Sequence, residues 1–288
     1  IAARDDSVLA DKIAQLIIWF SLKKKDLSEE DKSRLDSSLV EVYKRYGITF
    51  DNSTIVDENG NFRTMPILSD WYEILYQEQD TRHLAVVLSR YVTGSAAAMA
   101  GRNDIELNNK YIVLDLSGMP DDMIADGTFW ATSIAYDLIM NCEDELSALL
   151  ADELWSLVGA TANPQAAGFV LEMVKTIRGL GGIAVTSTQG MQDLFSLEGG
   201  SYGKGILDSS RIKLVMQMEE QEARLIQDKL NLSEDEVRQI TRFRRGEGLL
   251  CIGYNHVPVA FYTTPKEYEA ITTSPTDLRR ERQGDSDE

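Results

Sequence analysis

Cysteine and histidine are scarce in this chain, which narrows the chemistry it can perform. The 288 residues contain two cysteines, Cys142 and Cys251, and two histidines, His83 and His256, all far apart in the sequence. A structural zinc site needs four nitrogen or sulfur ligands at short spacings, and two isolated cysteines fit a reducing compartment better than a disulfide framework. We therefore expect neither a zinc site nor structural disulfides.

Long apolar runs are also missing. The longest candidate, residues 13–20, is about half of the roughly 20 residues that span a bilayer, and it contains Gln15. No signal peptide precedes it, and the chain opens at Ile1 rather than at Met. We expect a part of a longer protein, without an integral membrane segment.

Basic residues are outnumbered. Lys and Arg total 29 against 47 Asp and Glu, which gives a net charge of −18 and a pI near 4.6. This excess argues against a passive nucleic-acid clamp, because neutralising phosphates needs clustered Lys and Arg. It does not exclude a narrow basic channel inside an acidic assembly. With 43% hydrophobic and 26% charged residues, the composition is otherwise that of an ordinary globular protein.

The first hundred residues have helical patterns. Apolar residues recur at helical spacing over residues 8–20. Ser28 with Asp31 resembles a capping box that opens a helix ending at Gly47, and further helices are expected from Ser69 onward and over residues 82–91. We predict an all-α subdomain over residues 1–105, with a turn-rich stretch over residues 48–66 that holds a short hairpin.

After residue 101 the pattern changes to short apolar runs that alternate with helical segments. A helix is expected from about residue 164 to 180. Two helices follow the fourth run, the second capped by Ser233 with Glu236, and a hairpin-like pair of strands closes the pattern. The expected strands cover residues 111–116, 146–151, 183–189, 212–216, 249–254 and 257–262. This alternation is typical of an α/β domain with a buried, mostly parallel sheet, here over residues 106–275. The polar residues 276–288 are predicted to be a disordered tail.

Two adjacent carboxylates follow the second of these runs. Leu149-Leu150-Ala151-Asp152-Glu153 has the form of a Walker B strand, which delivers its acidic residues to the sheet edge where parallel sheets bind ligands. In that setting Asp152 positions Mg²⁺ through water and Glu153 activates the attacking water. The same pair also occurs as a solvated loop start or a helix cap, and the pattern alone leaves both interpretations open.

The next run ends in uncharged polar residues. Gln189 closes Thr186-Ser187-Thr188-Gln189, so neighbouring strands would place its amide beside the carboxylates, where it would bind a γ-phosphate or the lytic water. The alternative is an ordinary polar strand end. Arg178 lies in a basic helix end before Gly179, which the helix dipole alone explains, so a role as an arginine finger is the less favoured interpretation.

In this order, the motifs resemble the conjugative-transfer and type IV secretion ATPases of the CagE/TrbE/TraC family, within the HerA–FtsK group of hexameric motors. The resemblance covers most of residues 5–275, and the ordered series is more specific than any single motif. The matching segments are residues 65–70, 109–117, 151–155, 175–179, 188–194, 208–213, 232–236 and 245–248.

The resemblance implies a RecA-like P-loop NTPase core with a helical insertion, and the cofactors ATP and Mg²⁺. It implies that Asp152 places Mg²⁺, that Glu153 activates water and that Gln189 senses the γ-phosphate. Arg178 or Arg211 would act on the nucleotide of a neighbouring subunit. It also implies a homo-hexamer at the cytoplasmic face of the inner membrane, bound to other secretion-channel subunits, with transient DNA contact.

The sequence departs from the family in one respect. No GxxxxGK[ST] phosphate loop is found, and the nearest match, Gly203-Lys204-Gly205, lacks both the earlier glycine and the hydroxyl. We interpret residues 199–205 as a flexible surface loop. In this family the phosphate loop precedes the helical insertion, so we expect it before Ile1 and expect the present chain to be inactive by itself. Gly179 also stands where a second basic residue is common.

Three functions are therefore considered. The first is an ATPase motor that powers channel assembly or substrate transfer. The second is a scaffold subunit of the secretion channel that does not depend on nucleotide, and the third is a DNA-pumping coupling ATPase of the same superfamily. Several basic residues either contact nucleotide on a neighbouring subunit, line a pore, or form solvated faces: Arg211, Lys213, Arg242, Arg244 and Arg245.

Overall fold

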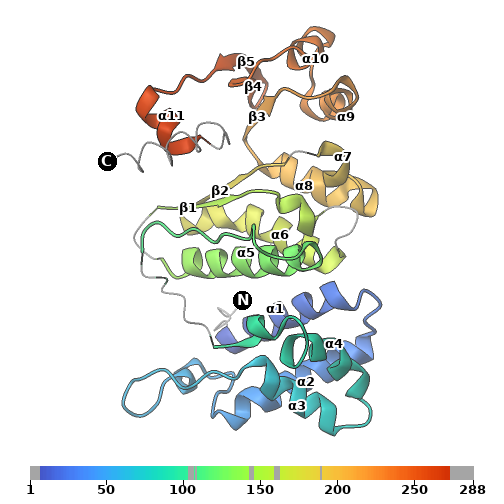
Figure 1. Ribbon diagram of the computed structural model, residues 1–288, viewed down its shortest axis with the longest axis vertical. Helices are drawn as coiled ribbons and strands as arrows, with labels where there is room; N and C mark the ends of the chain where they lie inside the picture. The colour runs from blue at the N-terminus through green and yellow to red at the C-terminus, as the bar shows by residue number, and fades with distance from the viewer. Residues whose placement is uncertain are drawn as a thin grey trace, which may run out of the picture. The chain divides into compact units, whose positions relative to one another are not determined.

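The computed structural model describes residues 7–102, 107, 109–142, 146–158, 163–188 and 190–272 (Figure 1). The chain divides into two compact units, Ile1–Ser209 and Ser210–Glu288. The predicted subdomain boundary between residues 105 and 106 lies inside the first unit and stays a prediction. The predicted disordered tail, residues 276–288, lies outside the described residues.

The first unit holds most of the helices and one pair of strands. Its α-helices and strands are α1 (Val8–Lys23), α2 (Glu29–Arg45), α3 (Leu68–Gln77), α4 (Arg82–Val92), α5 (Ile124–Met140), β1 (Ser147–Ala151), α6 (Pro164–Thr176), β2 (Gly182–Thr186), α7 (Met191–Leu194) and α8 (Ser201–Ser209). Short 3-10 helices cover Asn52–Ile55, Ala97–Ala100, Asp121–Met123, Leu154–Leu157, Ile177–Leu180 and Leu197–Gly200.

The predicted capping box at the start of α2 is confirmed. The N–H of Asp31 donates to Oγ of Ser28 at 3.0 Å, and the N–H of Ser28 donates to Oδ2 of Asp31 at 3.3 Å. The chain leaves the helix through Gly47, whose φ of 77° is in the left-handed region that glycine adopts without steric cost. Residues 7–100 are helices and turns, with one isolated antiparallel bridge between Val56 and Phe62 in the predicted hairpin stretch.

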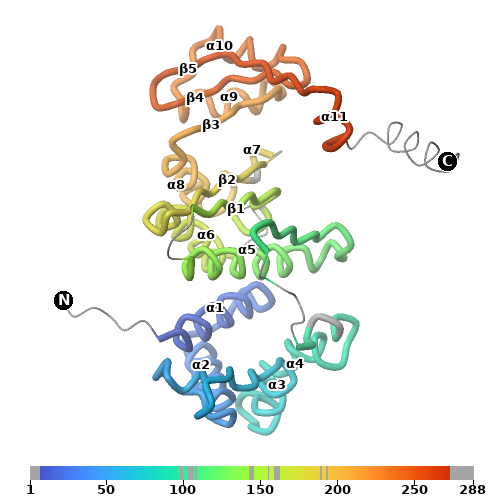
Figure 2. Tube along the Cα trace, turned by 90° about the vertical axis from the view of Figure 1, so that its left-hand side faces the viewer, coloured from blue at the N-terminus to red at the C-terminus, as the bar shows by residue number. Residues whose placement is uncertain are grey.

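Helix α1 is central to the first unit. It packs against α2 on one side and against α5 and α6 on the other, as the views of Figures 1 and 2 agree. Two of its aromatic residues contact different helices. The Phe20 ring lies 5.7 Å from that of Trp71 in α3, and the Trp19 ring lies 5.7 Å from that of Trp130 in α5. One continuous hydrophobic core therefore joins the helical region to the strands.

A buried carboxylate reinforces this junction. Asp126 in α5 is fully buried. Its Oδ1 accepts a hydrogen bond from Nε1 of Trp19 at 2.9 Å, and its Oδ2 accepts from the hydroxyl of Tyr91 at 2.8 Å and from Nζ of Lys23. Burial, and then the bond to Asp126, raise the pKa of Tyr91 above its usual range. The network ties α1, α4 and α5 together, and buried polar groups are stable only when satisfied in this way.

The two strands of the first unit confirm two of the predicted runs. β1 and β2 pair in parallel, with Ala151 opposite Thr186. Leu149 and Ala151 pack against the hydrophobic core, whereas Leu150, 75% exposed, lies on the other face. The pair therefore has one buried and one exposed face, where the sequence pattern predicted burial on both.

The predicted strand over residues 111–116 is wrong. The segment is extended but pairs with no other strand in the part of the chain that the structure describes. Tyr111 and Val113 are exposed, while Leu116 and Met119 lie over Gly127 of α5. An extended segment becomes a strand only when a neighbour pairs with its backbone groups, and apolar residues alone do not provide that neighbour.

The predicted surface loop over residues 199–205 is also wrong, because most of it belongs to α8. A Cβ atom on Gly203 would overlap the backbone oxygen of Leu194 at the end of α7. Gly203 therefore permits a close approach of α8 to the preceding chain, and this packing is sufficient to explain a glycine at that position.

Over residues 210–272, the described part of the second unit, there are a three-stranded antiparallel sheet and three helices. Its elements are β3 (Ile212–Met216), α9 (Glu220–Leu230), α10 (Glu234–Ile240), β4 (Glu247–Ile252), β5 (Asn255–Ala260) and α11 (Pro265–Ile271), with strand order β3-β4-β5. The predicted closing hairpin and the Ser233–Glu236 capping box are confirmed.

The prediction of a mostly parallel sheet is thus wrong in this unit. β3 and β4 are connected by two helices rather than one, and this extra reversal of the chain brings β4 back in the opposite direction. A single crossover helix would have made the pair parallel.

None of the helices in the described ranges combines the length and the apolar content needed to cross a bilayer.

Candidate active site

The carboxyl ends of β1 and β2 bring Asp152 and Ser187 to the same edge of the parallel pair. Each follows the last residue of its strand, and the last residues, Ala151 and Thr186, lie opposite each other. The N–H of Ser187 donates to the backbone oxygen of Ala151 at 3.1 Å and continues the ladder by one bond. This edge is where parallel sheets bind ligands.

The Asp152 carboxylate is held by two donors on one oxygen. Its Oδ1 accepts a hydrogen bond from Oγ of Ser187 and another from the N–H of Glu153 at 3.1 Å. Neither bond uses Oδ2, and the residue is exposed. The side chain is therefore oriented by the protein while one oxygen remains directed to other ligands.

Glu153 has an unusual backbone conformation for a residue with a side chain. Its φ of 53° is in the left-handed region, which costs about 1–2 kcal/mol for a non-glycine residue. The following 3-10 helix holds it there: the N–H of Ser156 donates to the Glu153 oxygen at 3.1 Å, and Leu154 and Leu157 are buried. The left-handed backbone at Glu153 therefore ends β1 and starts the 3-10 helix directly after Asp152.

Arg178 lies at the other end of the strands. It belongs to the 3-10 helix Ile177–Leu180, immediately before β2 begins at Gly182, and its side chain is exposed. At about 3.3 Å per residue, the five residues of β2 separate this end from the carboxyl edge by well over 10 Å. The structure does not bring Arg178 together with Asp152 and Glu153 in one chain.

Two predicted site residues remain, Gln189 and Arg211. Gln189 lies outside the described residues. Arg211 belongs to the second unit, where it is exposed and precedes β3.

Ser187 is the residue that sequence reasoning missed. It lies inside the Thr186-Ser187-Thr188-Gln189 run, in which the pattern pointed to the amide of Gln189. Its signal was its position: it follows its strand by one residue, as Asp152 follows β1.

One further carboxylate is held by a local turn. Oδ1 of Asp115 accepts the N–H of Ser117 at 2.9 Å, and this backbone hydrogen bond lowers the pKa of Asp115 below its usual range. Asp115 is the last but one residue of the segment 111–116 and is charged at neutral pH.

The donor set at the edge fits Mg²⁺ in a nucleotide site. Mg²⁺ keeps several waters and is commonly held by one or two carboxylates together with substrate phosphates, rather than by an all-protein cage. One oriented carboxylate with a free oxygen, as at Asp152, meets that requirement. Within the described ranges, no group of three or more His, Cys, Asp or Glu forms such a cage.

A parallel strand pair that ends in an oriented acidic site defines the class: an α/β protein with a strand-edge carboxylate site. Among solved structures, the chain is similar to VirB4 of Thermoanaerobacter pseudethanolicus, with a TM-score of 0.81 and 30% sequence identity; the match covers 91% of this chain and 71% of that chain. The chain therefore belongs to the VirB4 family of type IV secretion ATPases. A scan of family models found no match, and a search of curated proteins found none.

Proposed function

We propose that this chain is the motor part of a type IV secretion ATPase, which hydrolyses ATP with Mg²⁺ to power channel assembly or the transfer of DNA or protein. Membership of the VirB4 family supports the general role of a secretion-system motor. The observation that carries the chemistry is the strand edge, where Ser187 and the Glu153 backbone orient the Asp152 carboxylate.

In this proposal Asp152 holds the metal side of the site. Its Oδ1 is occupied by the two protein donors. Oδ2 would therefore be the oxygen that holds Mg²⁺ through a water. Bound Mg²⁺ would neutralise charge on the β- and γ-phosphates. Ser187 acts through Asp152 as a positioning residue, because it fixes which oxygen faces the substrate.

Glu153 is the proposed general base. Its carboxylate orients a water for attack on the γ-phosphorus and accepts the proton of that water as the bond to the leaving ADP oxygen breaks. Its position supports this role, since it directly follows Asp152 at the carboxyl edge of β1 and a strained left-handed backbone is held there.

Gln189 and the arginines complete the proposal. Gln189 would sense the γ-phosphate from the end of β2. Arg178 is at the opposite end of the strands, so it would reach only the nucleotide of another copy, which agrees with a homo-hexamer. Arg211 is the second candidate for that role. The partners would be other channel subunits at the cytoplasmic face of the inner membrane, with only transient DNA contact because the chain is strongly acidic.

The test is steady-state ATP turnover by the full-length protein with Glu153→Gln. We expect turnover to fall by roughly 10²–10⁴-fold, the usual contribution of a general base, while ATP binding measured by calorimetry is retained. Glu172→Gln is the matched control, because Glu172 is exposed on α6, away from the carboxyl edge. Unchanged turnover in Glu153→Gln would refute the assignment of the base.

A further inference from the structure

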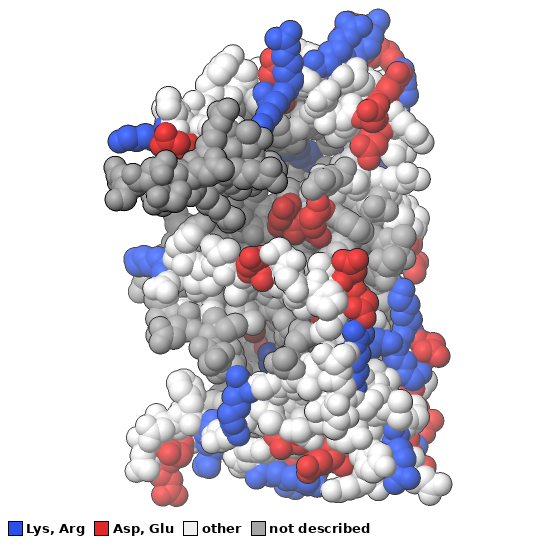
Figure 3. Space-filling view, viewed as in Figure 1, with Lys and Arg blue, Asp and Glu red and all other residues white. Residues whose placement is uncertain are grey.

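The acidic charge of the chain is unevenly distributed. Residues 1–209 carry 17 Lys and Arg against 32 Asp and Glu, whereas residues 210–272 carry nine against ten. Within residues 238–246 there are four arginines and no acidic residue. In the view of Figure 3, Lys and Arg side chains gather over the α10 end of the second unit. The second unit therefore has a local excess of positive charge.

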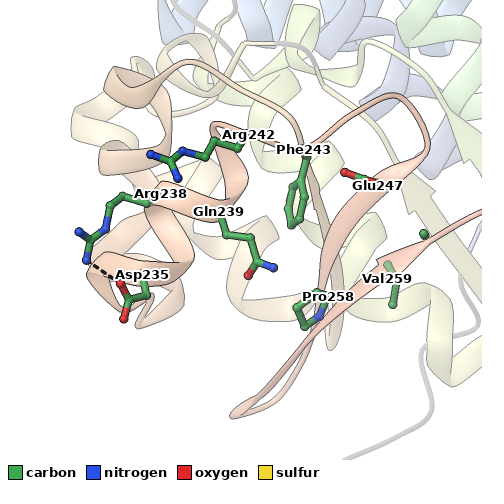
Figure 4. Close-up of a pocket in the computed structure, with 9 residues that line it drawn as sticks. Asp235, Arg238, Gln239, Arg242, Phe243, Glu247, Pro258 and Val259 are labelled. Atoms are coloured by element: carbon green, nitrogen blue, oxygen red, sulfur yellow. Dashed lines mark hydrogen bonds and ion pairs between the residues drawn. The ribbon is translucent and has the colours of Figure 1, made fainter.

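A cavity of about 660 Å³ lies beside these arginines, entirely within the second unit. Its lining comes from α10, from the turn that leads to β4, and from β5: Asp235, Arg238, Gln239, Arg242, Phe243, Glu247, Pro258, Val259 and Ala260 (Figure 4). Figure 4 shows the Arg238 and Arg242 side chains along one wall and the Phe243 ring between α10 and β5. A cavity of this size accommodates a short peptide segment or a small ligand.

Arg238 lies in α10 and Arg242 in the turn that follows it, and in Figure 4 both side chains extend toward the same side. Arg238 is paired with Asp235 at 2.5 Å, while Arg242 makes no ion pair with any residue in the described part of the chain. The other acidic residue of the lining, Glu247, turns its Oε2 toward the backbone N–H of Arg244 at 2.8 Å. Arg242 therefore remains available to an incoming anion, in the fork geometry that matches a carboxylate or a phosphate.

The opposite wall is apolar. The Phe243 side chain is only 7% exposed, so its ring is packed in place. Pro258 and Val259 of β5 complete this apolar wall. β5 is an edge strand. Pro258, which lies opposite Leu249 of β4, turns its backbone nitrogen to the open edge of the sheet, and this nitrogen carries no hydrogen to donate to an added strand. A ligand is therefore recognised by its side chains and not by strand addition along this edge.

We infer that this cavity is a docking site for a peptide segment of a partner protein that carries an acidic side chain next to an apolar one. The acidic group would bind Arg242, and the apolar group would pack on Phe243 and Pro258. The carboxylates of Asp235 and Glu247 disfavour a polyphosphate or a nucleic-acid backbone, since they oppose a dense run of negative charge. The inference does not depend on the proposed ATPase function.

The test is a titration of the ¹⁵N-labelled chain, followed by amide shifts, with the peptide acetyl-Gly-Glu-Leu-Glu-Gly-amide. We expect saturable shifts at Gln239, Phe243 and Val259. The matched peptide with glutamine in place of both glutamates should bind about tenfold more weakly or worse, because it loses the charge-assisted hydrogen bond to Arg242.

The variants separate the cavity from general electrostatics. Arg242→Ala should weaken binding by about tenfold for the same reason, whereas Arg224→Ala, an exposed arginine of α9 outside the cavity, should leave it unchanged. An unchanged amide spectrum away from the site would show that each variant is folded. Equal binding of the glutamine peptide, equal loss in both variants, or tighter binding of an oligothymidylate would each overturn the inference; the last result would indicate a nucleic-acid surface instead.

Discussion

The buried carboxylate of Asp126 gives the most quantitative prediction for this protein. Asp126→Asn keeps an acceptor for Nε1 of Trp19 but removes the charge that faces Lys23 and places an amide against it. Asp126 is 0% and Lys23 18% exposed, so the ammonium group reaches solvent only in part. Breaking a buried pair by removing one partner costs about 3–5 kcal/mol. Because Lys23 keeps some access to water, we expect a loss near the lower limit, about 3 kcal/mol.

Asp122→Asn is the matched control on the neighbouring turn. Asp122 pairs with Arg90 at 2.6 Å, but the two side chains are 60% and 40% exposed. Exposed pairs contribute about 0–1 kcal/mol, so the same chemical change should have a small effect there.

Urea denaturation followed by tryptophan fluorescence measures both variants. All four tryptophans lie before residue 210, so the signal reports the first unit. We expect the midpoint of Asp126→Asn to fall with an unchanged slope, which would indicate lost stability and not an altered denatured state. If the two variants lose the same free energy of unfolding to within about 1 kcal/mol, the network does not carry the stability assigned to it.

Three further changes test other parts of the argument. Ser187→Ala should lower ATP turnover of the full-length protein by about tenfold and raise its Mg²⁺ requirement, because a hydrogen bond to a charged group contributes roughly 1.5–3 kcal/mol; Ser187→Thr should restore most of both, and unchanged Mg²⁺ dependence would contradict the positioning of Asp152. Gly203→Ala should destabilise the first unit by about 1–3 kcal/mol through overpacking, whereas Gly179→Ala, whose Cβ would meet nothing within 4 Å, should be nearly neutral; equal melting temperatures would count against the close approach. Burial raises the pKa of Asp137, so the folded state holds that proton longer than the unfolded state and stability falls as pH rises through the window above about 4. Asp137→Asn should therefore gain stability relative to the parent between acidic and neutral pH, and a constant difference across that range would refute the assignment.

Local patterns predicted most of the elements. The Ser28–Asp31 and Ser233–Glu236 capping boxes, and the turn at Gly47, marked helix ends because each is satisfied by contacts within a few residues. The runs that became β1 and β2 were also found. Such features need no knowledge of distant parts of the chain.

Pairing between strands was the part that local patterns did not predict. Residues 111–116 show the alternation of an extended segment, yet they pair with no strand in the ranges described. β3 looked like another parallel strand, but the two helices after it return the chain in the antiparallel sense. In both cases the missing information is the identity and direction of the neighbour, which no short window contains.

The candidate site divides in the same way. By itself, the sequence determined that two adjacent carboxylates follow a short apolar run and that the motifs occur in the order of one ATPase family, since both are properties of linear order. Only the tertiary structure decided that Ser187 meets Asp152, because two residues 35 positions apart meet only through the parallel register of β1 and β2. It also decided that Arg178 lies at the far end of those strands, and that Arg238 and Arg242 border a cavity together with Phe243 and Pro258. Residue type and spacing fix which chemistry is available, whereas packing and register fix which groups are close enough to perform it.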